Sequence, residues 1–394
     1  MRLIRQNGAF RALFVSRTVS YLGDALSLVV LMLYVADVTG QALAVAALLL
    51  VGDFAPSLLA PWAGAVSDRF DLRRVMVVCD LVQAVLVGCL ALFLPPLPVL
   101  LLLVGLRALT AQVFGPASRS AMPFLVAEDE LPGANSTLGL GTNLGEVLGP
   151  LLAAALYPLL GVRGVLAVDA ATFLLSAAAL SQLPHLPRPR STQTTFLDDA
   201  RTGLHYVWRT PAVRAVVLGF CAVVLFNGVD DVAVIFLVRD SLTASPSAAA
   251  LALAGVGIGL LAGFAVIARQ HRLSMVVLFV VGLALNSAGN LLTGLSWAVA
   301  MVLALQIIRG VGIAGMDVGS STLLQTTVPT ELTGRVFGNL YGLVGISAGL
   351  SYVLGGLLLN ATSPRTTFLV AGGGGLIAAA LTGWRLSRPR EAAD

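Results

Sequence analysis

The sequence carries little charge. Only 11% of its 394 residues are Asp, Glu, Lys or Arg, whereas a soluble domain carries about 25%. So few charges cannot cover the surface of a soluble protein. In addition, 57% of the residues are hydrophobic and the mean hydropathy is +0.92. We therefore expect an all-α membrane protein whose outer surface mostly faces lipid.

Lysine is absent, and cysteine and histidine are scarce. A P-loop needs a lysine, so this chain does not hydrolyse ATP through one. The three cysteines fall in apolar runs, where such residues usually pack as small hydrophobes. Zinc-type spacing and a convincing nucleophile elbow are also missing. We predict no enzyme, no metal site and no cofactor, so an ion gradient or the substrate gradient must supply the energy. The three histidines lie near loops, at His185, His205 and His271.

Twelve apolar runs punctuate the chain. A membrane-spanning helix needs about 20 apolar residues, while barrel strands would appear as alternating segments of about 10 residues. These runs are continuous and longer, so they predict helices. The expected spans are 10–35, 42–66, 75–94, 97–119, 134–157, 164–183, 213–238, 248–268, 275–295, 298–320, 337–359 and 367–386.

The basic residues, all arginine, are distributed by side of the membrane. With the N-terminus inside, 18 fall on the inner face, 3 on the outer face, and 3 within spans, at Arg17, Arg107 and Arg309. The positive-inside rule demands such a bias. We therefore expect a multi-pass protein of the plasma membrane with both termini cytoplasmic. The excess of arginine over acidic residues reflects orientation in the membrane, so we expect no nucleic-acid partner.

The longest polar stretch lies in the middle of the chain. It contains proline-rich and threonine-rich pieces, followed by an amphipathic piece with Leu204, Val207 and Trp208 opposite Asp199 and Arg201. We interpret it as a cytoplasmic linker with a short interfacial helix. The predicted organisation is an N-terminal six-helix half at 1–183, the linker at 184–212 and a C-terminal six-helix half at 213–394.

The two halves resemble each other at an offset of about 200 residues. LLLVGLRALTAQVFG surrounds Arg107, and LALQIIRGVGIAGMD surrounds Arg309. Some 23 residues after each arginine, EDELPGANS in the first half corresponds to PTELTGRVFG in the second. Two similar six-helix halves are typical of parallel repeats around a central cavity. The sequence thus predicts a pseudo-symmetric secondary transporter.

The loop after the second span carries the strongest family resemblance. Gly64, Asp68, Arg69 and Arg73 fit the pattern G-x-x-x-D-R-x-G-R-R/K-x, with Asp71 in place of a glycine. Here the chain resembles the major facilitator superfamily, and within it the drug:proton antiporters of the macrolide-efflux and siderophore-exporter-like branch. Charge-assisted pairs in this loop would form a cytoplasmic latch that breaks as the halves rock. The alternative is an ordinary positive-inside loop.

A second resemblance lies in the fifth span. Gly141, Gly145, Gly149 and Pro150 resemble the antiporter pattern G-x-x-x-G-P-x-x-G-G, with alanine in place of the last glycines. Glycines four residues apart share one helix face and permit close helix packing. In the family this motif is associated with exporters. Arg107 also matches the buried arginine of a third family motif.

Charged side chains within the spans are candidates for proton coupling, because a charge at membrane depth is costly and normally faces a partner or a cavity. A proton carrier must exist both neutral and charged, and changing access to water and to an arginine permits this. We expect Asp24 and Glu146 to act so, with Arg107 as the pairing cation. A static ion pair of Asp24 with Arg107 or Arg17 is the alternative.

Three other acids near mid-bilayer are weaker candidates for the same role. Asp53, Asp230 and Asp231 lie near mid-bilayer, and the last two, being adjacent, point about 100° apart. Asp80 and Asp169 lie nearer helix ends, where we expect interfacial or latch positions. Asp240 and Asp317 belong to the same group.

The substrate pocket should be apolar with few polar groups. The resemblance implies export of lipophilic small molecules such as drugs or antibiotics, by proton antiport with alternating access, and we expect a monomer. The alternatives are a dedicated exporter of a metabolite or siderophore, an uncoupled facilitator, or a membrane receptor or scaffold. The predicted lining residues are Tyr21, Phe114, Asn143, Phe226, Asn227, Asn286, Asn290, Gln306 and Arg309.

Overall fold

The computed structural model describes residues 2–54, 70–127, 130–186, 196–269 and 274–387. In these ranges the regular structure is helical throughout, and ten helices are long and apolar enough to cross a membrane. The chain divides into two compact units. The boundary between them, after Gln193, falls within the predicted linker.

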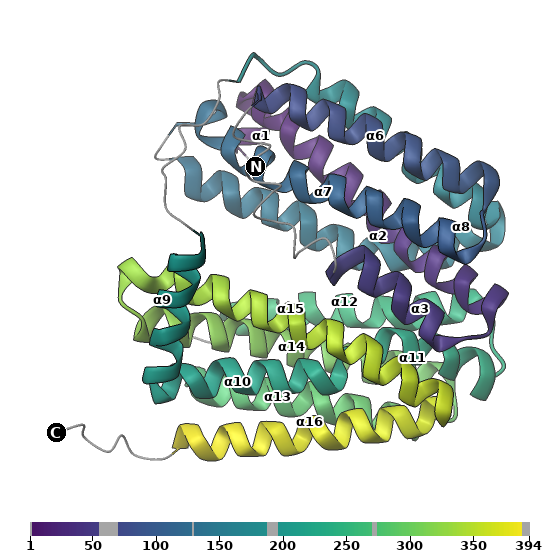
Figure 1. The fold of residues 1–394 in the computed structure, drawn as a ribbon, viewed down its shortest axis with the longest axis vertical. Helices are drawn as coiled ribbons and strands as arrows, with labels where there is room; N and C mark the ends of the chain where they lie inside the picture. Colours follow the sequence, from purple (N-terminus) through teal and green to yellow (C-terminus); the bar gives the residue numbers. More distant parts are fainter. Residues whose placement is uncertain (1, 55–69, 128–129, 187–195, 270–273, 388–394) are drawn as a thin grey trace. The chain divides into compact units, whose positions relative to one another are not determined.

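The N-terminal unit is one helical bundle (Figure 1). In it, α2 packs along α8, and α6 packs against both α7 and α8. A cluster of buried apolar side chains from these helices, including Phe10, Met76 and Phe114, fills one region of the bundle. Its elements are α1 (Arg2–Gln6), α2 (Gly8–Thr39), α3 (Ala42–Leu49), the π-helical turn η1 (Leu50–Phe54), α6 (Leu72–Phe93), α7 (Leu97–Leu125) and α8 (Leu131–Leu180).

The helix α8 supplies two of the expected spans. Its backbone leaves the helical conformation at Gly161, where φ is 61° and ψ is −175°. Such a positive φ is accessible to glycine without steric cost. The fifth and sixth spans therefore follow each other with a single-residue break, where hydropathy predicted a loop of several residues.

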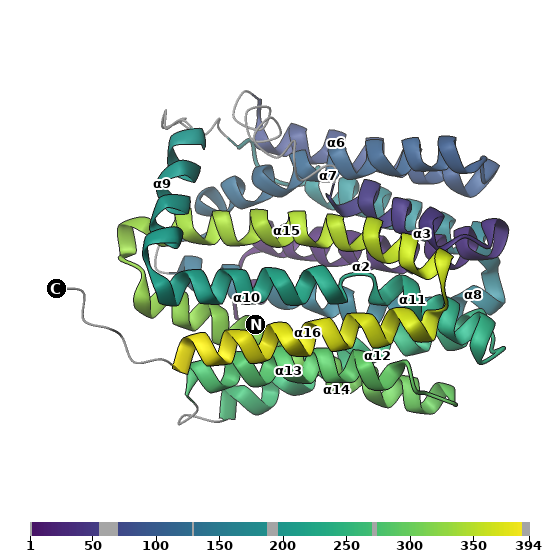
Figure 2. The same cartoon turned by 60° about the horizontal axis from the view of Figure 1, so that its bottom comes forward.

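The C-terminal unit forms the second bundle. Figure 2 shows α10, α13, α14 and α16 running alongside one another, with α9 lying across the end of α10. The helix α14 packs against α12 and α13, and α16 against α13 and α10. Its elements are α9 (Phe196–Arg209), α10 (Pro211–Asn227), α11 (Asp230–Phe236), the π-helical turn η3 (Leu237–Ser241), α12 (Pro246–Arg269), α13 (Met275–Thr293), α14 (Val299–Thr327), α15 (Thr330–Ala361) and α16 (Pro364–Ser387).

The seventh span, Pro211–Ser241, agrees with the expected 213–238 but contains a local break in its helix. A turn at Gly228 and Val229 separates α10 from α11. Glycine favours helices less than almost any other residue. At Gly228 a side chain would also approach Cβ of Ser351 to 2.9 Å. The polar residues on either side of the turn, Asn227 and Asp230, are both buried.

Several helices extend beyond their apolar runs. The prediction of 298–320 covers only the apolar part of α14, which continues for 29 residues to Thr327, a length of about 43 Å. The bilayer core is about 30 Å thick, so hydropathy detects only the lipid-facing part. Backbone hydrogen bonding continues the helix through polar residues such as Gln325.

Glycines allow helix backbones of the C-terminal unit to touch. A Cβ added at Gly259 of α12 would lie 1.9 Å from the carbonyl oxygen of Ile307 in α14, and one added at Gly310 would lie 2.0 Å from that of Val256. Small residues at helix contacts are the main device for packing in lipid. The described helices fit the expected twelve spans in two pseudo-symmetric six-helix halves, with α8 holding two of them. Most of the expected second span lies outside the described residues.

Candidate functional site

The N-terminal bundle holds an ion pair between two spans. Arg107 of α7 donates to Asp24 of α2, and the two side chains are 12% and 28% exposed. The other candidate cation, Arg17, instead donates to the hydroxyl of Ser118 and lies over the ring of Phe114, 5.9 Å from its centroid. Of the two arginines considered, Asp24 therefore forms its ion pair with Arg107.

Two further acids are deeply enclosed in the same bundle. Asp80 of α6 and Asp169 of α8 are 1% and 0% exposed. The hydroxyl of Ser27 donates to Oδ2 of Asp169 at 2.5 Å, and the hydroxyl of Ser176 donates to Oδ2 of Asp80. Sequence reasoning assigned both acids to interfacial positions and missed this enclosure. One signal was available, because Asp169 and Ser176 stand seven residues apart and so share a helix face.

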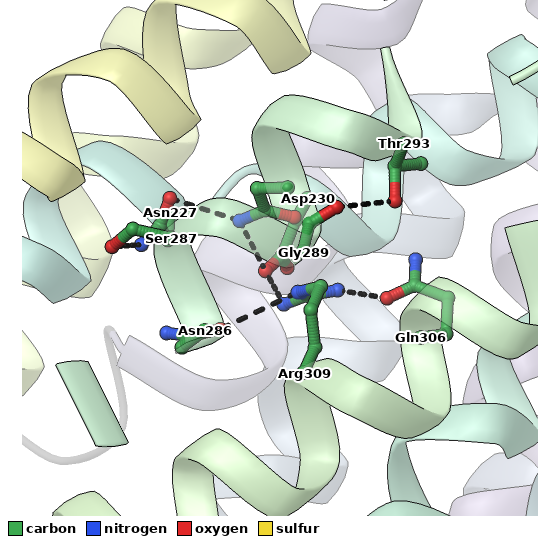
Figure 3. A network of polar contacts seen from close by, with 9 residues as sticks. Asn227, Asp230, Asn286, Ser287, Gly289, Thr293, Gln306 and Arg309 are labelled. Carbon is green, nitrogen blue, oxygen red and sulfur yellow. Dashed lines mark hydrogen bonds and ion pairs between the residues drawn. The ribbon is translucent and has the colours of Figure 1, made fainter. Parts of the chain in front are cut away.

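The C-terminal bundle holds its own ion pair. Arg309 of α14 pairs with Asp230 of α11, and their side chains are 3% and 9% exposed. Nε of Arg309 donates to Oδ1 of Asn286 at 3.4 Å, and the guanidinium also donates to Oε1 of Gln306 (Figure 3). This pair is therefore enclosed by amide side chains of α13 and α14.

Amide side chains extend the same network to α10. Nδ2 of Asn290 donates to Oδ1 of Asn227 at 2.9 Å and to Oδ2 of Asp230 at 3.4 Å. Nδ2 of Asn227 donates to the hydroxyl of Ser287 at 3.1 Å, as Figure 3 shows. Both sides of the turn in the seventh span are thus tied to α13, and Asp230 also to α14.

Two polar atoms of this network lack partners. Oδ1 of Asn290 and Nε2 of Gln306 are buried and find no hydrogen-bond partner among the described residues. A buried polar atom normally has a partner, from protein or from water. These two groups thus leave one acceptor and one donor available inside the C-terminal bundle.

The two ion pairs occupy equivalent places in the repeat. Asp230 follows Asp24 by 206 positions, and Arg309 follows Arg107 by 202. In each half an acid from the first span meets an arginine from the fourth. The sequence repeat indicated the two arginines, and Arg107 was expected to pair with Asp24. The structure adds Asp230 as the partner of Arg309.

The glycines of the fifth span face α2. A Cβ at Gly141 would lie 2.2 Å from the hydroxyl of Thr18, and one at Gly149 would lie 2.5 Å from Cβ of Ala25. Gly145 similarly abuts Tyr21, at 3.1 Å. Pro150 follows directly within the helix. The motif therefore holds the fifth span close against the span that carries Asp24.

The predicted latch is only partly described. Gly64, Asp68 and Arg69 lie outside the described residues, whereas Arg73 donates to the backbone carbonyl of Ser181 at the end of α8. Asp71, the departure from the family pattern, caps α6 by accepting from the backbone N–H of Arg74 at 2.8 Å.

A second contact of Asp71 ties α6 to the segment after α8. Its Oδ2 accepts from the backbone N–H of Leu186 at 3.2 Å and lies 2.9 Å from Nδ1 of His185. A glycine at this position would make none of these contacts, so the departure from the family pattern has a structural use here.

The remaining predicted residues are spread over different environments. Tyr21 is 37% exposed and Phe226 is 39% exposed, whereas Phe114 is packed in the N-terminal cluster. Phe226 lines an apolar groove of about 300 Å³ between α10 and α16. Asp231 is half-buried. The side chains of Asp53, Asn143 and Glu146 lie outside the described part of the structure.

A fold of two similar six-helix bundles, each with a membrane-embedded acid–arginine pair, defines a multi-pass membrane transport protein. The family model for the Major Facilitator Superfamily matches residues 13–269 and 231–394, which together span nearly the whole chain. The chain therefore belongs to the Major Facilitator Superfamily, whose members are transporters and not enzymes.

Individual relatives agree with this assignment. The chain is 28% identical to the uncharacterized MFS-type transporter YfiS of Bacillus subtilis (strain 168), covering 94% of this chain and 91% of the relative. It is 21% identical to macrolide efflux protein A of Streptococcus pyogenes, covering 92% of each. The crystal structure of the nucleoside transporter NupG matches with a TM-score of 0.78 at 11% identity, over 97% of this chain and all of that one. That similarity supports the fold alone.

Proposed function

We propose that this transporter exports lipophilic small molecules, drugs and antibiotics among them, in exchange for protons by alternating access. It would act as a monomer in the plasma membrane with both termini in the cytoplasm. The observation that carries the proposal is the ion pair of Asp24 and Arg107, because a carboxyl group within a span can bind and release a proton. The similarity to a macrolide efflux protein supports the direction of transport.

The chemistry of coupling follows from the two states of Asp24. As a carboxylate it pairs with Arg107, and the pair is favoured where water is scarce. When a proton binds, Asp24 becomes neutral and its ion pair with Arg107 is lost. A step that changes the exposure of Asp24 to water therefore changes its proton affinity. Alternation of this exposure between the two sides of the membrane would couple proton entry to substrate exit.

The surroundings of Asp24 suit a lipophilic cation. Tyr21 lies one turn before Asp24 on the same helix, so both belong to one face of α2, and both are partly exposed. A carboxylate beside an aromatic face attracts organic cations. Binding of such a substrate and binding of a proton would then compete for the same acid, which is the requirement for antiport.

The other predicted acids have different roles in this proposal. Asp230 is held by Arg309 in an enclosed network, so we assign the C-terminal pair to stabilising the interrupted seventh span. Glu146 remains the second predicted proton carrier beside Asp24, and Asp53 and Asp231 remain weaker candidates for proton binding. The unfilled acceptor of Asn290 and donor of Gln306 are candidates for polar contacts with a substrate.

A proteoliposome assay tests the proposal. The full chain is reconstituted, and uptake of ethidium, a lipophilic cation, into inside-out vesicles is followed with and without an acidic interior. We expect an acidic interior to drive uptake and an uncoupler to abolish it. Uptake that ignores the pH gradient would favour an uncoupled facilitator. If ethidium and a panel of lipophilic antibiotics all fail, a dedicated exporter of a metabolite or siderophore is favoured.

A further inference from the structure

We propose that Asp169 and Asp80 form an internal proton path through the N-terminal bundle, in which Asp169 exchanges a proton with Asp24 and Asp80 is the next station toward the end of the bundle at which α6 begins. This inference rests on the proposed proton antiport. It adds two proton-carrying residues, on α8 and α6, to the single acid–arginine pair.

Asp169 lies against the segment of α2 that carries Asp24. A Cβ at Gly23, the residue before Asp24, would lie 2.4 Å from Oδ1 of Asp169 and 2.3 Å from the hydroxyl of Thr172. Gly23 is thus the residue that allows the carboxyl group of α8 to approach α2. Ser27, one turn after Asp24, completes the contact through its hydrogen bond to Oδ2 of Asp169.

The partners of Asp169 are hydroxyl groups. Besides Ser27, the hydroxyl of Thr172 lies 3.3 Å from its Oδ1, and no ion pair of Asp169 occurs within the described residues. An enclosed carboxylate without a cation is strongly disfavoured. Protonation removes that charge, and hydroxyl partners can then accept as well as donate. A hydroxyl can pass a proton on by releasing its own as it receives another.

Asp80 of α6 contacts the same face of α8 through Ser176. Its partner Ser176 follows Asp169 by seven residues, or two helical turns, and Thr172 lies between them. Oδ1 of Asp80 is buried without a hydrogen-bond partner among the described residues, so the carboxyl group has an oxygen free to hold a proton. Ser176 is only a few residues before the end of α8, where Arg73 binds the carbonyl of Ser181.

The charged groups facing the path come from α2 and α7. Asp24 and Arg107 act on Asp169, while Asp24 and Arg17 act on Asp80. Asp169 can accept a proton only after it has passed its own on toward Asp80. When Asp24 is then protonated, its proton can pass to the carboxylate of Asp169: one O–H bond breaks at Asp24 and one forms at Asp169. Asp24 then regains its ion pair with Arg107. The summed charge of Asp24, Arg107 and Asp169 is unchanged by the transfer.

In the described part of the second half, the position equivalent to Asp169 carries no acid. The residue that follows Asp169 by 206 positions is Gly375, and a Cβ there would meet the hydroxyl of Ser287 at 2.4 Å. The repeat therefore reproduces the acid–arginine pair but not the enclosed acid beside it. This difference assigns proton conduction to the N-terminal half.

The test compares Asp169→Asn and Asp80→Asn with the wild type in proteoliposomes. Uptake of ethidium driven by a pH gradient should fall on the order of a hundredfold, the usual contribution of one proton-transferring group. Exchange of ethidium across the membrane without a gradient should stay near wild type, because substrate contacts are intact. Asp240→Asn, which changes an exposed acid, is the matched control and should transport normally.

The outcomes distinguish failure of the proposed proton antiport from failure of the proposed proton path. If wild-type uptake ignores the pH gradient, the proposed function fails. If wild-type uptake follows the gradient and both variants keep full gradient-driven uptake, the path is overturned while the function stands. If Asp169→Asn does not fold, Ser27→Ala removes only the hydroxyl that α2 donates to Asp169. It should slow gradient-driven uptake several-fold, and an unchanged rate would overturn the path equally.

Discussion

Arg309 and Asp230 form an ion pair that is almost completely enclosed, with 3% and 9% of their side chains exposed. The equivalent pair of Arg107 and Asp24 is 12% and 28% exposed. The same chemistry therefore sits in two environments within one chain. We expect the enclosed pair to matter for stability and the more exposed pair to matter for coupling, and the first two predictions separate these roles.

Asp24→Asn should abolish uptake driven by a pH gradient, because an amide cannot bind or release a proton at physiological pH. Thermal stability in detergent should change little, since the amide still accepts a hydrogen bond from Arg107. Gradient-driven uptake in proteoliposomes is the measurement, with Glu146→Gln tested in parallel. Full coupling in both variants would remove these two acids from the mechanism.

Asp230→Asn should destabilise the C-terminal bundle, because it leaves Arg309 enclosed without a counter-charge. Removing one partner of a buried ion pair lowers the free energy of unfolding by about 3–5 kcal/mol. The double variant Asp230→Leu/Arg309→Met should recover most of that loss, since apolar replacement of both charges is often neutral. Thermal unfolding in detergent measures both. Equal melting temperatures of the single variant and the wild type would contradict a stabilising role.

Gly259→Ala should separate α12 from α14. The added methyl would lie 1.9 Å from the carbonyl oxygen of Ile307, so one backbone must move. Overpacking of this kind costs about 1–3 kcal/mol. Gly345→Ala in α15 is the control, because nothing lies within 4 Å of that position. A lower melting temperature for the first variant alone is the expected result.

Asp71→Ala should lower stability by about 1 kcal/mol, because α6 loses its N-cap. Asp71→Asn keeps a side-chain oxygen that can accept from the backbone N–H of Arg74 and should stay near wild type. Asp71→Ala and the family residue, tested as Asp71→Gly, both also lose the hydrogen bond from the backbone N–H of Leu186. Melting temperatures of the three variants would rank Asn above both Ala and Gly, and any other order would contradict the capping role.

Most of the fold was accessible from the sequence because lipid imposes simple rules. Long apolar runs fixed the number of spans, and the repeat around Arg107 and Arg309 divided them into two halves. The interruption at Gly228 was not predicted. It depends on the hydrogen bonds of Asn227 and Asp230 to α13 and on the close approach of Ser351 to Gly228. Both are contacts between helices, which the sequence alone does not reveal.

The candidate site was accessible only in part. A charged residue within an apolar span is easily recognised in the sequence, so Asp24, Arg107 and Arg309 could be named as candidate site residues. The sequence also led us to expect Arg107 as the partner of Asp24, as observed. The pairing of Arg309 with Asp230 was not predicted, because the sequence does not say which helices are neighbours. Asn286, Asn290 and Gln306 hydrogen-bond within the C-terminal network, which the sequence did not predict. Their place in the lining of a substrate pocket stays a prediction. Asp169 was underrated because distance along a span measures depth and not enclosure by neighbouring helices.

Two six-helix halves with the same pair at equivalent positions imply a history of duplication followed by specialisation. A duplicated unit begins with two copies of each functional group, and selection can then keep one copy for transport chemistry and the other for architecture. The open pair and the enclosed pair correspond to such a division. Under the proposed mechanism, redesign of the coupling ion would be confined to the first half, and the second would be carried over unchanged as a scaffold.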